Sequence, residues 1–258
     1  MRRRAQTAAL AALVTLALLL FGGPTAARAQ QAAGCEPDIS LDTESGLGTL
    51  LTLIDQVRAR GGGDAEVDRA LAQRACLVRP LAGGGGGIPH VDGLTVAAPD
   101  LYTIAVVDGV DRWVAITDWS FTTLPAAPMT GNQAVATWFD VPVNPVLQVV
   151  HHSGLTSQYP NTSSEEAADV NEHGVGFLIA PQKSATDMNV ATGRSALVFE
   201  GSGPCTELTA RAAFAHTWND TSIGSLGITS TGPAIGWTDT VDRAVNYSSP
   251  TRVSGVCG

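Results

Sequence analysis

The spacing of apolar residues changes at a run of five glycines, Gly83–Gly87, and this change constrains the fold more than any other feature of the chain. Before the run, apolar residues recur every three or four positions, which is typical of one face of a helix. After it they alternate with polar residues, and turn residues follow at short intervals, as in β-strands. The sequence therefore predicts a small helical segment followed by a mainly β domain.

Two helices are predicted before the glycine run. The first spans Ser45–Arg60, and Gly61–Gly63 ends it. Its apolar face consists of Leu47, Leu50, Leu51, Ile54 and Val57. Asp64 is a suitable N-cap for the second helix, and Pro80 stops that helix. Helices joined by so short a turn pack antiparallel, so this segment is expected to form a helical hairpin.

Many short strands without intervening helices are predicted after the run. The first two flank a hairpin turn at Asp108–Asp111. The predicted strands are Leu101–Val107, Arg112–Thr117, Ala134–Asp140, Val146–His152, Gly176–Ile179, Ala196–Phe199, Glu207–Trp218, Ser222–Ile228 and Thr251–Val256. Residues Pro160–Gly174 are expected to form a long polar loop. This pattern favours an antiparallel β-sandwich or a jelly roll.

Four cysteines are present, and their even number favours disulfides in an exported protein. Two antiparallel helices would bring Cys35 beside Cys76, while Cys205 and Cys257 bracket the end of the β region. Of the three possible connectivities, we therefore expect Cys35–Cys76 and Cys205–Cys257. No C-x-x-C pair occurs, which argues against a cysteine metal site.

The first thirty residues have the order of a secretory signal peptide. Arg2–Arg4 precede an apolar run, Ala8–Phe21, and cleavage is expected between Ala29 and Gln30. The run is shorter than the roughly 20 apolar residues that a membrane-spanning helix needs. The expected location is therefore extracellular. Lipid attachment through Cys35 is an alternative, and the arginines leave both Sec and twin-arginine export open.

The predicted organisation is a signal peptide at 1–29, a helical hairpin at 30–82, a flexible glycine-rich linker at 83–91 and a β-sandwich domain at 92–258. Removal of the signal peptide leaves 11 basic against 24 acidic residues, a net charge near −13. Such a surface repels phosphate backbones and anionic lipids, so nucleic acid and membrane insertion after processing are not expected. A glycan or a protein is the expected kind of ligand.

Three histidines are the candidates for a metal site. Strand alternation places His151 with the apolar side chains of its strand and turns His216 inward on the later strand Glu207–Trp218. His173, in the polar loop, could close over them as a third ligand. This is a hypothetical divalent-metal or acid/base site. The simpler interpretation is that each histidine is separately hydrogen-bonded and that the protein has no cofactor.

All five tryptophans lie in the predicted β region. Core packing is the favoured interpretation, because large aromatic side chains dominate the interiors of β-sandwiches. If Trp113, Trp119 and Trp237 were instead exposed, they would form a stacking platform for sugars.

Acidic residues provide a second set of catalytic candidates. The two carboxylates of a retaining glycosidase need only lie about 5 Å apart, and they can come from anywhere in the chain. The candidates are Glu165, Glu166, Glu172, Glu200 and Glu207. Their spacing in the sequence does not single out a pair.

The motifs of several large enzyme classes are not found. The sequence contains no G-x-S-x-G, no H-E-x-x-H, no Walker loop and no dinucleotide fingerprint. The leading hypothesis is an exported, disulfide-stabilised, non-enzymatic protein with a binding or surface-structural role. The alternatives are an extracellular hydrolase acting on polysaccharide or another polymer, and a carbohydrate-binding module.

Overall fold

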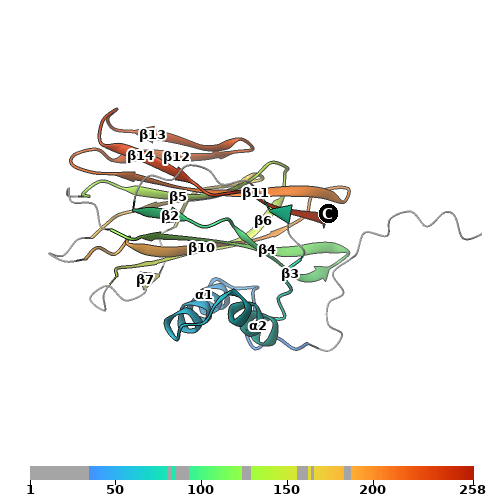
Figure 1. Ribbon diagram of the computed structural model, residues 1–258. Helices are drawn as coiled ribbons and strands as arrows, with labels where there is room; N and C mark the ends of the chain where they lie inside the picture. Colours follow the sequence, from blue (N-terminus) through green and yellow to red (C-terminus); the bar gives the residue numbers. More distant parts are fainter. Residues whose placement is uncertain are drawn as a thin grey trace, which may run out of the picture.

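The computed structural model describes residues 35–80, 83–84, 93–123, 129–155, 162–163, 166–182 and 187–258 (Figure 1). Within these ranges the chain is mainly β, and all of its named strands pair antiparallel. The predicted signal peptide, its cleavage site and residues 85–91 of the predicted linker lie outside the described residues.

The predicted helical hairpin is confirmed as α1 (Glu44–Ala59) and α2 (Asp64–Ala75). The Thr43 hydroxyl caps α1 by accepting a hydrogen bond from the Gly46 N–H at 3.1 Å. Asp64 was the wrong choice of N-cap for α2. Gly63 is the N-cap, and its N–H donates to the Glu66 carboxylate at 3.1 Å, so Asp64 is already the first helical residue.

Two large sheets and one small one contain the strands. The six-stranded sheet has the order β2 (Leu94–Val96), β4 (Val110–Phe121), β10 (Thr192–Glu200), β6 (Asn144–Ser153), β7 (Thr162–Ser163), with β3 (Asp100–Val107) also paired to β4. The seven-stranded sheet has the order β1 (Gly83–Gly84), β15 (Thr251–Val256), β11 (Thr206–Thr217), β5 (Gln133–Phe139), β9 (Gly174–Ile179), β8 (Ala167–Asn171), with β14 (Arg243–Tyr247) also paired to β11. A separate hairpin consists of β12 (Ile223–Thr229) and β13 (Gly232–Trp237).

One apolar cluster joins the two large sheets. The ring of Phe139 on β5 lies 4.7 Å from that of Phe199 on β10, measured between centroids. The rings of Trp119 on β4 and Phe214 on β11 are 5.2 Å apart. All four side chains are buried and belong to this cluster. Buried side chains of both large sheets therefore belong to a single apolar cluster.

The helical hairpin packs on the other face of the six-stranded sheet (Figure 1). Leu47, Leu50 and Leu51 of α1 are fully buried and share a cluster with Val114 of β4 and Val198 of β10. Each such side chain contributes roughly 1.5–3 kcal/mol through burial. The hairpin is thus fixed to the sheet by its own apolar face.

Two arginines reinforce this packing from the ends of the hairpin. Arg79, just after α2, binds Asp68 of α2 at 2.9 Å and also pairs with Asp100 of β3. Arg112 of β4 binds Asp42, which precedes α1, at 2.8 Å. Both guanidinium groups therefore connect the helical segment to strands of the sheet.

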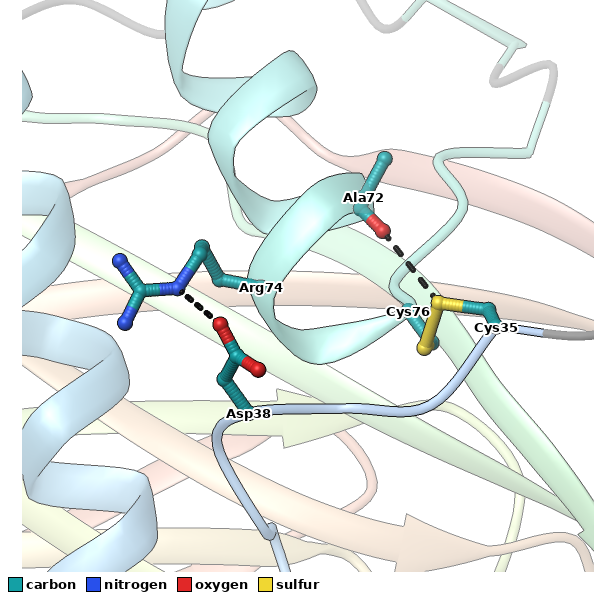
Figure 2. Close-up of a disulfide and its surroundings, with 5 residues drawn as sticks. All are labelled: Cys35, Asp38, Ala72, Arg74 and Cys76. Atoms are coloured by element: carbon teal, nitrogen blue, oxygen red, sulfur yellow. Dashed lines mark hydrogen bonds and ion pairs between the residues drawn. A yellow bond between two sulfur atoms is a disulfide. The ribbon is translucent and has the colours of Figure 1, made fainter.

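Both predicted disulfides are confirmed, Cys35–Cys76 and Cys205–Cys257. Figure 2 shows the first, which joins the segment before α1 to the residue that follows α2. Beside it, the Arg74 side chain binds the Asp38 carboxylate at 2.7 Å. The N-terminal segment is therefore held to the end of α2 by a covalent bond and an ion pair.

All nine predicted strands are present, with ends that differ by a few residues. The loop predicted over Pro160–Gly174 is wrong in part, because β7 and β8 fall within it. The residues of β8, AADVN, have low strand propensity and lie at the edge of the sheet. The strands β2, β13 and β14 were also missed. The strand β13 was missed because it begins with Gly232 and Pro233, which are typical of a turn. Proline is nevertheless tolerated there, because each strand of a two-stranded sheet has one edge without a partner.

The start of the predicted linker also takes part in the fold. Gly83 and Gly84 pair with Arg252 and Thr251 of β15 as the short strand β1.

Candidate functional site

A pocket of about 290 Å³ lies between α1 and one end of the six-stranded sheet, and we name it the α1 pocket. Its polar lining from the helix is Asp55 and Arg58. Its polar lining from the sheet is Thr95, Asp118, Ser120, Thr192 and Arg194. Because α1 packs against the sheet only along its apolar face, polar side chains gather at this margin of the interface.

Arg194 is the central charged group of the pocket. Its guanidinium donates to both oxygens of Asp118, with 2.9 Å between Nη2 and Oδ2, and to Oδ1 of Asp55 at 2.5 Å. The side chain is only 9% exposed. Burial alone would lower the pKa of Arg194, but the Asp118 and Asp55 carboxylates outweigh it and raise that pKa. The guanidinium stays charged and bridges β4, β10 and α1.

Three hydroxyl side chains line the pocket in a row across neighbouring strands. Thr95 of β2 is the register partner of Ser120 on β4, and Ser120 is the partner of Thr192 on β10. Register partners on adjacent strands point to the same face of a sheet. None of the three hydroxyls is hydrogen-bonded to another described residue. Within the described part of the chain, their donors and acceptors are therefore unused.

His151 lies beside this pocket, on the same face of the sheet. His151 is on β6, where it is the register partner of Arg194 on β10, and it is buried under α1 next to Gly48. Burial lowers the pKa of His151, while the Asp55 carboxylate opposes that shift. The prediction that His151 points with the apolar side chains of β6 is confirmed, because Val149 belongs to the cluster under the helices.

His216 lies in a different layer of the molecule. Its strand neighbour Phe214 belongs to the core between the two large sheets, and its ring lies 5.8 Å from Phe121 and 5.3 Å from Trp218. Neither ring nitrogen has a hydrogen-bond partner among the described residues. Burial lowers the pKa of His216 to about 4. The six-stranded sheet therefore separates His216 from His151.

His173 occupies the turn between β8 and β9. Its N–H donates to the Asn171 side chain at 2.8 Å, and its carbonyl accepts a hydrogen bond from the Phe139 N–H at 2.8 Å. The structure does not bring the three candidate histidines together. No group of three histidine, cysteine, aspartate or glutamate side chains within the described ranges is arranged to hold a metal ion.

The candidate tryptophans do not form an exposed row. Trp113 is 3% exposed and Trp119 is 2% exposed, and both belong to the core between the sheets. The Trp119 indole N–H donates to the Val190 carbonyl at 3.0 Å. Trp237 is half-buried and stacks on Arg243, with 5.3 Å from the guanidinium carbon to the ring centroid. Neither Trp113 nor Trp119 can present a ring face to a sugar.

The candidate glutamates are dispersed. Glu200 on β10 is bound to Arg112 at 2.6 Å, and Glu172 lies 3.7 Å from the His173 ring. Glu166 and Glu207 are exposed, and Glu165 lies outside the described residues.

The pocket residues were missed at the level of sequence, although a weak signal was present. Asp118 and Ser120 are two residues apart on β4, as are Thr192 and Arg194 on β10. Such spacing places each pair on one face of its strand. Only the register between the strands shows that the two pairs are adjacent.

No helix within the described residues is long and apolar enough to cross a bilayer.

No family model matches the chain, and no curated protein matches it. A chain from a structure of manganese lipoxygenase of Gaeumannomyces graminis and zonadhesin of Komagataella pastoris is 10% identical, with a TM-score of 0.29 over 65% of this chain. The match spans 53% of that chain, about half its length. A structure of AvmM, which catalyses macrocyclization in alchivemycin A biosynthesis, is 11% identical, with a TM-score of 0.26 over 69% of this chain and 96% of that one. Similarity this low assigns neither a fold nor a function.

Proposed function

We propose that this chain is an exported, non-enzymatic protein that binds a ligand at the α1 pocket and that its β region is a sandwich or jelly roll. The observation that carries the proposal is the pairing of Arg194 with Asp118 and Asp55. This pairing fixes the position of the pocket's charged groups and leaves its hydroxyls free, an arrangement suited to holding a ligand.

The chemistry of the paired charges supports binding over hydrolysis. A glycosidase site of the common kind needs one carboxyl group that holds a proton and a second that acts as base or nucleophile. In the α1 pocket both carboxylates accept hydrogen bonds from one guanidinium, which competes with a substrate for the same oxygens. The arrangement stabilises the contact between helix and sheet.

Export is supported by the covalent structure and by the first thirty residues. Two disulfides are compatible with an extracellular location, because such bonds persist in oxidising compartments. The Arg2–Arg4 cluster, the apolar run and the small residues before Gln30 add an independent argument.

Export is tested by expressing the full chain in a bacterial host and sequencing the N-terminus of the extracytoplasmic product. We expect it to begin at Gln30. An Ala29→Leu variant is the matched control, because a large residue at the cleavage site should leave the leader attached. Recovery of the uncut chain in the cytoplasm with four reduced cysteines would contradict export.

The absence of catalysis is tested separately, by screening the purified mature protein for turnover of glycans, esters and peptides. We expect no activity above that of a heat-unfolded sample. Reproducible turnover that is abolished by Glu200→Gln, His151→Ala or His216→Ala would establish the hydrolase alternative in place of this proposal.

A further inference from the structure

We infer that the α1 pocket binds one ring of a neutral saccharide. The inference rests on the proposed binding function and assigns its ligand class.

The charges that line the pocket cancel. Asp55 and Asp118 contribute two negative charges, and Arg58 and Arg194 contribute two positive ones. Arg194 is bound to both acids, and Arg58 is paired with Asp64 at the rim. An anionic ligand would meet guanidinium groups that are already occupied and carboxylates that repel it. An ammonium ligand would be repelled by the two arginines, so a neutral ligand is favoured.

The hydrogen-bonding groups suit a ligand with many hydroxyls. Thr95, Ser120 and Thr192 each offer one donor and an acceptor oxygen. A carboxylate can accept about four hydrogen bonds, so Asp118, which accepts two from Arg194, keeps acceptor positions for a ligand. A sugar ring presents hydroxyl groups that both donate and accept, which matches this mixed lining.

The size of the pocket suits about one sugar ring. A volume of about 290 Å³ is at the lower end of the range for small-molecule sites, roughly 300–1,000 Å³. The Trp119 ring is turned into the core, so no aromatic face stacks on the sugar. Binding by hydrogen bonds alone is expected to be weak, with a Kd on the order of 1 mM.

The test is a titration of the ¹⁵N-labelled mature protein, followed by amide chemical shifts. The probes are a neutral methyl hexopyranoside, the corresponding hexuronic acid and the corresponding hexosamine. The neutral glycoside is expected to shift the amides of Thr95, Ser120 and Thr192. The two charged sugars should bind at least about tenfold more weakly, since each brings a charge into a pocket whose own charges are paired.

The variant that tests the site is Ser120→Ala/Thr192→Val, which removes two hydroxyls and nearly preserves the shape. Loss of two hydrogen bonds should raise the Kd for the neutral glycoside by about tenfold or more. The matched control is Ser254→Ala/Thr206→Val, at exposed positions of β15 and β11 in the other sheet, and its Kd should equal that of the wild type. Equal thermal unfolding midpoints of the two double variants would show that both are folded.

Three results would overturn the assignment: equal affinity of the pocket variant and the wild type, preference for a charged sugar, or no pocket shifts with any sugar. The proposed non-enzymatic function would survive the second result, because a charged ligand can still be bound without turnover. The non-enzymatic role fails in the activity screen and export fails in the N-terminal sequencing, so neither failure can be confused with failure of the saccharide assignment.

Discussion

Arg194 and Asp118 lie directly opposite each other on the neighbouring strands β10 and β4, and the same guanidinium reaches Asp55 on α1. One side chain thus joins two strands and a helix that are far apart in the sequence. The helical hairpin is consequently fixed to the sheet near the end of α1 by this bridge, and next to the start of α1 and the end of α2 by Arg112 and Arg79.

Replacement of Arg194 should destabilise the fold strongly. Arg194→Met removes the cation and leaves two carboxylates facing each other, each 34% exposed. We expect a loss of about 3 kcal/mol in the free energy of unfolding, the low end for a broken buried pair, because the carboxylates retain some solvent. Urea denaturation measures this loss. The control Arg74→Met, whose pair with Asp38 is exposed, should cost about 1 kcal/mol or less. Equal losses for both variants would contradict the bridging role.

Acid should destabilise the protein through His216. Burial lowers the pKa of this histidine from 6.5 to about 4, so the folded state keeps the ring neutral while the unfolded state binds a proton. The contribution of His216 to the free energy of unfolding is therefore constant above pH 6.5. The free energy of unfolding falls as the pH drops from 6.5 toward 4, by about 3 kcal/mol in total. His216→Leu should reduce this dependence. The measurement is the free energy of unfolding of both proteins at pH 7.5, 5.5 and 4.5. Parallel profiles would show that another group is responsible.

Gly193 should not tolerate a side chain. A Cβ atom at this position would lie 2.1 Å from a ring carbon of Trp119, whose buried indole cannot move away. Gly193→Ala is expected to cost roughly 1–3 kcal/mol, as overpacking of a core does. Gly224→Ala on β12 is the matched control, because its Cβ would meet no atom closer than 3.7 Å. The midpoint of thermal unfolding and the tryptophan fluorescence should change only in the first variant.

Each disulfide should contribute to stability without specifying the fold. The loops closed by Cys35–Cys76 and Cys205–Cys257 span 41 and 52 residues, for which chain entropy gives about 4 kcal/mol each as an upper figure. Cys35→Ser/Cys76→Ser is expected to lower the free energy of unfolding by up to this amount. The far-UV circular dichroism should keep its β signal, because the apolar cluster under the helices remains. Peptide mapping of the wild-type protein without reductant should recover the two disulfides Cys35–Cys76 and Cys205–Cys257 and no others.

A feature of the structure could be predicted from the sequence where it depends on residues that are close together in the chain. The helices and the nine strands were predictable because alternation and the helical repeat record which side of each segment is buried. The Cys35–Cys76 pair followed from the helical hairpin, which brings its two ends together, and the Cys205–Cys257 pair followed because these cysteines bracket the end of the β region. Edge strands such as β8 carry a weaker signal, because one side of their backbone has no partner strand and few of their side chains are buried.

The site depended on information that no local pattern contains. The alternation of apolar and polar residues correctly predicted that His151 and His216 point toward apolar surroundings. A sheet has two faces, however, and a different layer of the protein covers each face. His151 lies under α1, while His216 lies between the sheets, so the two do not meet. The identity of the layer covering each face is fixed by strand order and by the docking of the hairpin. These are contacts between segments that are distant in the chain.

The amino-acid sequence by itself determined the kinds of element and the boundary between helical and β regions, because both depend on burial within a short stretch of chain. It also indicated the cysteine pairs, because each pair brackets one segment of the chain. Tertiary structure alone decided that Asp55, Asp118 and Arg194 form one bridge and that three hydroxyls align beside it. The physical reason is register: a polar side chain finds its partner only when strand pairing and helix docking place the two within hydrogen-bonding distance.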